Sequence, residues 1–537
     1  MTESTQPDTP DTDVIVVGAG FAGLYMVHSL RTRGFAVEGI EAAGNVGGTW
    51  YWNRYPGARC DVDSLDYQYA FSDSLQRGWS WTERYATQPE ILRYLEYVAD
   101  ALDLRREFRF STRVTAANFD ADRLLWRVTT DDGTTRTARF CVLAVGCLSV
   151  TQVPDFPGLG DFTGAWYHTG NWPHEHVDFH GKRVGIIGTG SSGVQAIPLL
   201  AAQAEELWVF QRSPNFSVPA RNATLPAEAV DAYKDRFLAT RAEAIRSDFG
   251  NSTWRSLPSA LAAPADERTR EYESRWEFGG AGFMVTYSDL MIDKAANDTA
   301  ADFIRGKIRA IVKDPTTAGL LSPTDHPIGA KRICVDTNYY ATFNRPNVHL
   351  VDVRSQPIKC ITANGVRTEA TDYPLDCLVF ATGFDAMTGP LTRIDIRGRN
   401  GRSLRDLWRD GPACYLGLMI ADFPNLFTIT GPGSPSVLSN MVISIEQHVD
   451  WITDCLQALR TRQARIIEAD LDAQTEWMAH VQEAAAQTLF PEGNSWYVGA
   501  NIPGKPRVFM PYTGGVRAYR EKCDAVAASD YEGFRVS

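Results

Sequence analysis

Two copies of one glycine-rich turn, each between a short apolar run and a helical pattern, constrain this chain more than any other feature. The first copy, Gly18-Ala-Gly-Phe-Ala-Gly23, follows an apolar run that begins at Asp13, and the second, Gly188-Thr-Gly-Ser-Ser-Gly193, follows a run that begins at Arg183. A further β-branched or apolar run comes after each helix, at Val37–Ile40 and Leu207–Phe210. Each copy is a βαβ unit, so we predict an α/β fold with two Rossmann-like dinucleotide-binding domains.

The three glycines of each turn have separate roles in holding a pyrophosphate. The first permits the tight turn, the second lets phosphates approach the backbone, and the third lets the helix pack close to the strand. The free N–H groups and the positive dipole end of the helix then face the phosphates. The positions are Gly18, Gly20 and Gly23 in the first copy, and Gly188, Gly190 and Gly193, with Thr189 and Ser191 between them, in the second.

The residue that follows the second strand differs between the two copies. Glu41 ends the first unit, where a carboxylate accepts a hydrogen bond from a ribose hydroxyl. The second unit ends in Gln211 and Arg212. A guanidinium pairs with a 2′-phosphate that a carboxylate would repel, so the second site is predicted to prefer NADP(H). The alternative for Arg212 is an ordinary surface arginine after a strand.

One site with an acid and one with an arginine suggest FAD and NADPH in the same chain. Gly47 and Gly48 support FAD, because small residues let the backbone lie close to an extended cofactor. FAD- and NADP-dependent disulfide reductases carry a redox cysteine pair after such a Gly-Gly. Here the stretch Thr49–Cys60 has a single cysteine, so a thiol relay is not expected and something else must accept electrons from the flavin.

The order of these patterns predicts a discontinuous organisation. Helical spacing with no strand-like run fills the middle of the chain, and strand patterns resume at Val348 and Leu375. We expect an FAD-binding domain from residues 1–150 and 383–537, an NADP-binding domain from residues 151–221 and 329–382, and a helical insertion at residues 222–328.

Composition narrows the class of protein further. The chain has 53 Lys and Arg against 65 Asp and Glu, a net charge of −12, which argues against nucleic acid or an anionic membrane as the main partner. No apolar run is long enough to span a bilayer, and the polar start Met1–Asp13 does not resemble a secretory signal.

The nine cysteines are scattered without a C-x-x-C pair, which predicts reduced thiols, no metal site and a cytoplasmic location. His174, His176 and His180 are interpreted as a solvated loop.

A longer motif resembles a known family. Phe162-Thr-Gly-Ala-Trp-Tyr-His168-Thr-Gly-Asn-Trp172-Pro173 is similar to the fingerprint F-x-G-x-x-x-H-T-x-x-W-P of flavin-dependent (class B) Baeyer–Villiger monooxygenases. Other stretches that resemble this family are Trp50–Gly57, Ala330–Arg332, Ala381–Asp385 and Trp496–Asn501. The likeness runs from about Asp13 to Phe534. It implies that His168 couples domains and is not catalytic.

The resemblance implies an activity and a substrate class. Members of this family use FAD, NADPH and O₂ to convert ketones to esters or lactones through a C4a-peroxyflavin anion. The loop Gly431–Met441 resembles the phenylacetone and steroid monooxygenases more than the cyclohexanone enzymes. This likeness favours aryl, polycyclic or other bulky cyclic ketones as substrates.

The resemblance also assigns residues to the reaction. Arg332 matches the family's active-site arginine, a permanent cation that holds the peroxide anion deprotonated. Asp61 matches the aspartate beside the flavin, and we expect it to pair with Arg332, orient the guanidinium and limit the cost of burying it. The alternative for Arg332 is a structural salt bridge.

Further residues are expected to bind the cofactors. Lys331 shares the 2′-phosphate with Arg212, while Thr189 and Gln195 donate to phosphate oxygens or to the nicotinamide end. Trp496 matches a residue that folds over the nicotinamide nucleotide, and its alternative is an ordinary core tryptophan. On the flavin side we expect contacts from Thr49, Trp50, Trp52, Tyr67, Val114 and Met441.

Two other functions compete with this interpretation. The first is an N- or S-oxygenating flavin monooxygenase, although Trp172, Pro173 and Arg332 argue against it. The second is a redox-sensing nucleotide-binding protein without enzyme activity, which nothing in the sequence favours. We expect a monomer whose partners are a ketone and O₂.

Overall fold

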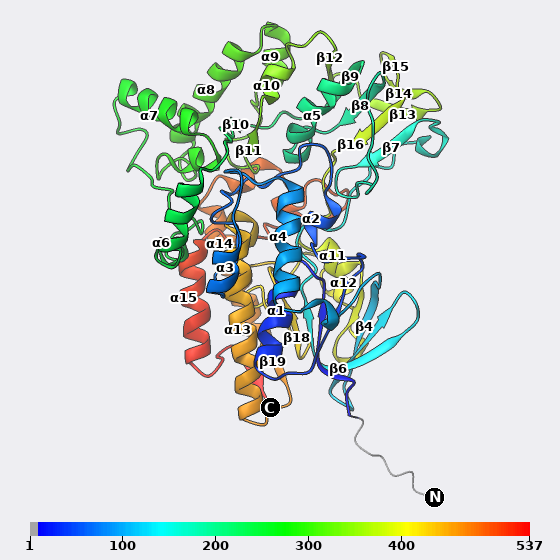
Figure 1. The fold of residues 1–537 in the computed structure, drawn as a ribbon, viewed down its shortest axis with the longest axis vertical. Helices are drawn as coiled ribbons and strands as arrows, with labels where there is room; N and C mark the ends of the chain where they lie inside the picture. Colours follow the sequence, from blue (N-terminus) through cyan, green and yellow to red (C-terminus); the bar gives the residue numbers. More distant parts are fainter. Residues whose placement is uncertain (1–8) are drawn as a thin grey trace, which may run out of the picture.

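The computed structural model describes residues 9–537 and confirms the α/β class. The polar start Met1–Asp13 lies in part outside the described residues. The two glycine-rich turns belong to two separate sheets, which occupy the lower and upper halves of the molecule in Figure 1. Both turns follow a strand and open a helix, as the sequence predicts.

The first sheet draws its strands from both ends of the chain. Its order is β17-β4-β5-β6-β1-β2-β3, and β18 also pairs with β6. The pairs β1–β2, β1–β6, β2–β3 and β18–β6 are parallel, whereas β4–β5 and β5–β6 are antiparallel. The strands are β1 (Thr12–Val17), β2 (Val37–Ile40), β3 (Phe108–Arg109), β4 (Val114–Asp120), β5 (Leu125–Thr130), β6 (Thr135–Leu143), β17 (Asp395–Arg397) and β18 (Leu426–Thr428).

Helices from distant parts of the chain cover this sheet. The helix of the first turn, α1 (Phe21–Thr32), packs against α13 (Met441–Thr461), and Figure 1 shows α4 and α15 running beside them. Fully buried Val16, Leu24, Val142 and Val449 share one core between sheet and helices. The remaining elements of this half include α2 (Thr49–Trp52), α3 (Asp73–Gly78), α4 (Gln88–Ala101), α11 (Gly389–Thr392), α12 (Leu404–Leu407), α14 (Leu471–Ala486), α15 (Gly515–Ala528), β19 (Ile467–Ala469) and β20 (Phe534–Val536).

The second sheet is entirely parallel, with the order β12-β9-β8-β16-β7. Its strands are β7 (Ala165–His168), β8 (Arg183–Ile187), β9 (Glu206–Gln211), β12 (Val348–Asp352) and β16 (Cys377–Phe380). Helix α5 (Ser191–Gln203) packs on β8 and β9, and the short helix α10 (Tyr339–Thr342) packs on α5. A small antiparallel sheet lies at the edge, formed by β13 (Ile358–Thr362), β14 (Gly365–Thr368) and β15 (Asp372–Pro374).

The middle of the chain is helical, as its spacing predicts. Between β10 (Ser217–Pro219) and β11 (Cys334–Asp336), which pair in parallel, the residues described form no strand. They form α6 (Ala227–Ile245), α7 (Ala265–Phe278), α8 (Lys294–Ile311) and α9 (Pro315–Leu321). The exact domain boundaries that we assign stay a proposal.

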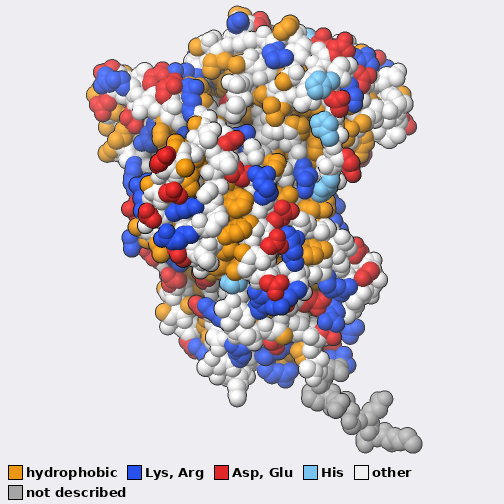
Figure 2. All heavy atoms as spheres, in the orientation of Figure 1, with side chains coloured by type: hydrophobic (Ala, Val, Ile, Leu, Met, Phe, Trp, Pro, Cys, Tyr) orange, Lys and Arg blue, Asp and Glu red, His pale blue; other side chains and the backbone are white. Residues whose placement is uncertain are grey.

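The surface and the cysteines fit the composition. No helix within residues 9–537 is long and apolar enough to cross a membrane. Figure 2 shows acidic and basic side chains interspersed over the face drawn, without a large field of one sign. All nine cysteines are free thiols, and no group of His, Cys, Asp and Glu within the described part of the chain could hold a metal ion.

Candidate active site

The first glycine-rich turn needs its glycines for steric reasons. Gly18 has a φ of +108°, and a Cβ there would lie 2.5 Å from the Ala144 carbonyl oxygen. A Cβ on Gly23 would lie 1.7 Å from the Gly18 oxygen, so the helix could not pack this close with any other residue. Gly48 approaches Gly20 so closely that its Cβ would lie 2.8 Å from the Gly20 Cα. The result is a strip of bare backbone along which an extended cofactor fits.

Glu41 lies beside this strip, held by the backbone. Its carboxylate oxygens accept hydrogen bonds from the N–H groups of Ala19 (2.6 Å) and Ala43 (2.7 Å). Burial raises the pKa of Glu41, against the lowering effect of these hydrogen bonds. Each oxygen retains a lone pair for a ribose hydroxyl. Val114 begins β4 and is buried in the core with residues of β1 and β2.

The aromatic stretch after the first unit joins the two halves of the molecule. Trp50 is buried and its indole N–H donates to the Tyr67 hydroxyl at 3.3 Å. Trp52 is half-buried, and its carbonyl accepts from the backbone N–H of Trp172, the tryptophan of the long motif. Thr49 is exposed at the start of α2. These residues therefore form a wall at the junction of the two sheets.

The second turn repeats the geometry of the first. Gly188 has a φ of +113°, and a Cβ on Gly193 would lie 2.3 Å from the Gly188 oxygen. Gly190 is exposed, with open space where a Cβ would stand, and Ser191 begins α5 beside it. The Thr189 hydroxyl donates to the Ser213 carbonyl at 3.0 Å and so fixes the segment that carries Arg212.

Gln195 connects the second turn to the flavin side. Its amide oxygen accepts from the Tyr55 hydroxyl at 2.7 Å, and its amide nitrogen donates to the Arg59 carbonyl at 3.2 Å. Gly57 packs so closely on α5 that a Cβ would lie 2.5 Å from the Gln195 carbonyl oxygen. In this structure Gln195 therefore fixes one half of the molecule to the other.

The two predicted phosphate-binding cations lie near each other. Arg212 is exposed and forms no hydrogen bond or ion pair with any residue that the structure describes. Lys331 is half-buried, and burial together with the nearby charges of Arg212 and Arg354 lowers its pKa, while Asp325 opposes this shift. Both cations are therefore available to an anion.

Arg332 and Asp61 form the ion pair that the sequence predicts. The guanidinium Nε and Nη2 donate to the two Asp61 carboxylate oxygens, each at 2.8 Å. Nη1 donates to the Val437 carbonyl at 2.8 Å. These bonds use three of the five N–H groups of the arginine. The Arg332 side chain, which is 33% exposed, therefore joins Asp61 of the first half to the loop Gly431–Met441.

The electrostatics keep this pair ionised. Burial acts to raise the pKa of Asp61, but the charge of Arg332 and its hydrogen bonds outweigh burial and hold the pKa below its usual value. The Asp61 carboxylate in turn raises the pKa of Arg332, against the effect of burial. The site therefore holds a permanent cation whose orientation is fixed by a permanent anion.

Sequence reasoning missed two groups that surround Arg332. Tyr497 is buried beside it, and burial raises the pKa of Tyr497 to about 12 even though the arginine acts to lower it. Its position next to Trp496 in the motif Trp496–Asn501 was the only signal. The Val437 carbonyl had no signal, because a backbone group carries no side-chain identity.

Apolar side chains lie close to the ion pair. Trp496 and Met441 are half-buried and share a cluster with Leu148 and Leu438. Met441 is the first residue of α13, which Asn440 caps by accepting from the Val442 N–H. In the loop at residues 431–441, all side chains before position 438 are buried and Leu438 is half-exposed. The same cluster contains Val437, whose carbonyl accepts from Arg332, so its half-buried members offer an apolar surface close to the guanidinium.

His168 is held by groups of its own half of the molecule, and the coupling of domains that the resemblance implies stays a prediction. His168 ends β7, its Nδ1 accepts from the Gly170 N–H at 2.9 Å, and burial lowers its pKa to about 4. A neutral, buried imidazole is not poised to shuttle protons near pH 7.

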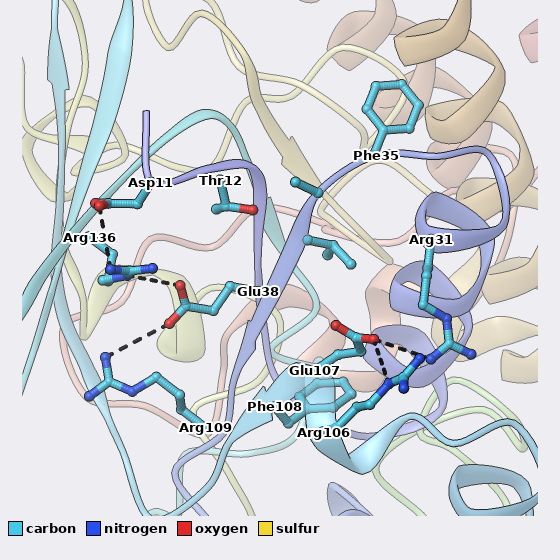
Figure 3. A pocket seen from close by; sticks show the side chains of 12 residues that line it. Asp11, Thr12, Arg31, Phe35, Glu38, Arg106, Glu107, Phe108, Arg109 and Arg136 are labelled. Atoms are coloured by element: carbon cyan, nitrogen blue, oxygen red, sulfur yellow. Dashed lines mark hydrogen bonds and ion pairs between the residues drawn. The ribbon is translucent and has the colours of Figure 1, made fainter. Parts of the chain in front are cut away.

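A groove at the opposite edge of the first sheet is not part of this site. Its lining, drawn in Figure 3, includes Thr12 at the start of β1 and Glu38 near the start of β2, whereas the glycine-rich turn follows the other end of β1. Arg136 donates to Glu38 at 2.9 Å, and Arg31 and Arg106 both pair with Glu107. Since each of its four arginines is ion-paired with one of its three carboxylates, we interpret this groove as a surface ion-pair network.

Comparisons with known proteins place this geometry in a family. A family model described as pyridine nucleotide-disulphide oxidoreductase matches residues 15–244. A Baeyer-Villiger monooxygenase of Pseudooceanicola batsensis is 45% identical over 540 residues, which cover 99% of this chain and 97% of the relative. A phenazine N-monooxygenase of Lysobacter antibioticus is 44% identical over 531 residues, which cover 98% of this chain and 97% of the relative.

Solved structures agree along the whole chain. A structure described as oxidized steroid monooxygenase bound to NADP has a TM-score of 0.94 and 52% identity, and the match covers 98% of this chain and 99% of the other. A complex described as OTEMO with FAD and NADP has a TM-score of 0.95 and 40% identity, covering 99% of this chain and 100% of the other.

Proposed function

Because the chain belongs to the flavin-dependent Baeyer–Villiger monooxygenases, which use FAD and NADPH, we propose that it oxidises bulky ketones, of the aryl or polycyclic kind, to esters or lactones. The observation that carries this proposal is the Arg332–Asp61 pair beside an apolar surface at the junction of the two nucleotide-binding halves.

The residues of the first turn fit FAD. The bare backbone at Gly18, Gly20 and Gly48 would lie along the pyrophosphate, and Glu41 would hold the ribose. Trp50 and Tyr67 would wall the ring system, with Thr49, Trp52 and Met441 around it, while Val114 would lie at the ribose end near Glu41. When bound, FAD supplies the redox chemistry, taking electrons from NADPH and passing them to O₂.

Arg332 supplies the charge that this chemistry needs. An anionic oxygen attacks a carbonyl carbon more readily than its protonated form, and a cation that cannot give up its proton stabilises that charge without quenching it. Asp61 and Val437 hold the guanidinium in place before the reaction, so no reorganisation is required when charge develops. Asp61 is a positioning partner in this scheme.

The NADPH side follows from the second turn. Its backbone N–H groups at the start of α5 would bind the pyrophosphate, and Arg212 and Lys331 would bind the 2′-phosphate. Thr189, Ser191 and Gln195 would order this region, and Trp496 would cover the nicotinamide end.

The apolar surface argues for the substrate class. Leu148, Leu438, Met441 and Trp496 are half-buried apolar members of the cluster that contains Val437, whose carbonyl accepts from Arg332. Such a surface suits a carbonyl compound with a large apolar body, because burial of that body supplies the binding free energy. The similarity to a steroid monooxygenase, at 52% identity, supports the same proposal.

A ketone panel with product identification tests this proposal. The purified yellow protein is mixed with NADPH and, separately, phenylacetone, a steroid ketone and a small ketone such as acetone. We expect ester formation with a higher kcat/KM for the two bulky ketones. If acetone gives the highest kcat/KM, the proposed substrate class is wrong.

A second candidate function is oxygenation of a heteroaromatic nitrogen. The observation that favours it is the relative named phenazine N-monooxygenase, which is 44% identical along nearly the whole chain. The same panel should include phenazine and a thioether. An N-oxide formed faster than any ester would favour this candidate over ketone oxidation.

A further inference from the structure

The strand register of the second sheet brings a third cation to the predicted 2′-phosphate position. Strands β9 and β12 are parallel neighbours (Figure 1), with Gln211 opposite Asp352. The chain therefore leaves both strands at the same edge, and the Val353 N–H donates to the Gln211 carbonyl at 3.0 Å. This register places Arg354 beside Arg212 and Ser213.

Arg354 is fixed to the second nucleotide turn. Its Nη2 donates to the Ser213 hydroxyl at 2.8 Å, and the Ser213 carbonyl accepts from the Thr189 hydroxyl at 3.0 Å. Two hydrogen bonds thus connect the guanidinium to the residue between Gly188 and Gly190. Arg354 is an integral part of this edge and not an independent surface arginine.

Asp325 holds Arg354 from the other side. The two form an ion pair through Nη2, and the Asp325 carboxylate also bonds to the His326 ring at 2.6 Å. His326 is buried, with a side chain only 1% exposed, and burial lowers its pKa. A neutral His326 therefore fixes the carboxylate, and the carboxylate fixes the arginine.

The charges at this edge do not cancel. Arg212, Lys331 and Arg354 contribute three positive charges. Asp325 and Asp352, whose carboxylate accepts from the Arg354 backbone N–H at 3.0 Å, contribute two negative charges, so one positive charge remains. Burial and the two arginines lower the pKa of Lys331, as expected where cations crowd without enough counter-charge. A phosphate monoester carries nearly two negative charges at pH 7, so the net positive charge of this edge favours its binding.

We propose that Arg354 is a third specificity-determining residue, which binds the 2′-phosphate of NADPH together with Arg212 and Lys331 and is positioned for it by Asp325 and Ser213. This inference rests on the proposed binding of NADPH at the second turn. It adds to that proposal a residue beyond the two cations that the sequence indicates.

Calorimetric titration of the FAD-loaded protein with 2′,5′-ADP and with 5′-AMP tests this role without catalysis. These probes share the adenosine and the 5′-phosphate and differ in the 2′-phosphate. Arg354→Ala should weaken the binding of 2′,5′-ADP about tenfold, because a hydrogen-bonded charge pair is lost at a half-exposed site. The affinity for 5′-AMP should change by less than about twofold, as for an ordinary surface substitution. Arg354→Lys should retain part of the preference.

Arg367→Ala is the matched control. Like Arg354, Arg367 lies in the second half of the chain and is ion-paired with an aspartate, Asp372. The two side chains are similarly exposed, at 50% for Arg367 and 47% for Arg354. It should leave both affinities unchanged within about twofold. An equal loss of both probes in Arg354→Ala, or a loss no larger than that of the control, would overturn the role of Arg354. If the wild-type protein itself binds 2′,5′-ADP no more tightly than 5′-AMP, the proposed placement of NADPH is wrong instead.

Discussion

Replacement of Arg332 by Ala is the most direct test of the active site. The substitution removes the guanidinium that bonds to both Asp61 oxygens and leaves that carboxylate, 21% exposed, without this partner. Loss of one preorganised donor to a developing oxyanion costs about 3 kcal/mol, or roughly 10²- to 10³-fold in rate. We therefore expect ester formation to fall by at least that factor while FAD stays bound.

The same change affects folding, and the two effects must be separated. Breaking a buried ion pair from one side costs about 3–5 kcal/mol, but water reaches both partners here, so we expect about 1–3 kcal/mol. The double variant Arg332→Ala/Asp61→Ala removes the unpaired carboxylate as well. It should recover much of the lost Tm without recovering ester formation.

The assay follows NADPH consumption, ester and hydrogen peroxide in parallel, with flavin absorbance as a measure of bound FAD. Without a cation to hold the reactive oxygen, we expect NADPH oxidation to yield hydrogen peroxide in place of ester. A flavin-loaded Arg332→Ala variant that forms ester within about tenfold of the wild-type rate would refute the role of Arg332. Recovery of ester formation in the double variant would show that the single variant failed by misfolding.

Three other predictions concern single side chains. Arg212→Ala should raise the KM for NADPH and change the KM for NADH little, since only NADPH carries the 2′-phosphate. Steady-state kinetics with both nucleotides check this prediction. An equal effect on both KM values would place the 2′-phosphate elsewhere. Glu41→Gln places an amide where two backbone N–H groups donate, so it should lower the flavin content of the purified protein. The ratio of flavin to protein absorbance measures this content, and an unchanged ratio would contradict the role of Glu41. Burial raises the pKa of Asp336 to about 6 in the folded protein, whereas the pKa of an aspartate in the unfolded chain is about 4. The folded protein therefore keeps the Asp336 carboxyl protonated to a higher pH, and it loses the associated stability as the pH rises through about 6. The Tm of Asp336→Asn relative to wild type should therefore increase between pH 4 and pH 7, and a difference independent of pH would show that Asp336 has no raised pKa.

Much of the fold could be predicted because its signals are local. The strand at Val37–Ile40 has the predicted bounds, and both glycine-rich turns lie where the spacing places them. Glycine is required where φ is positive or where a Cβ would meet the neighbouring strand. Both conditions depend on a few residues around the turn. The helical middle of the chain follows in the same way from its periodicity.

The candidate site was predicted only as far as family motifs reach. The family resemblance predicts that Arg332 pairs with Asp61, and the two hydrogen bonds between these side chains agree with that prediction. Tyr497 and the Val437 carbonyl were missed, because neither chemistry is visible in a motif. Arg354 was missed as well, since it lies in no glycine-rich turn and follows an ordinary strand.

The sequence by itself determined the nucleotide-binding turns and, through Glu41 and Arg212, the expected preference of each for its nucleotide. Only the tertiary structure decided how the active-site arginine is held, since Asp61 lies 271 positions away from Arg332 along the chain. It also decided which cations share the phosphate edge, through the register between β9 and β12. The physical reason is that turn geometry depends on neighbouring residues, whereas an ion pair between distant segments exists only after the sheets and loops have packed.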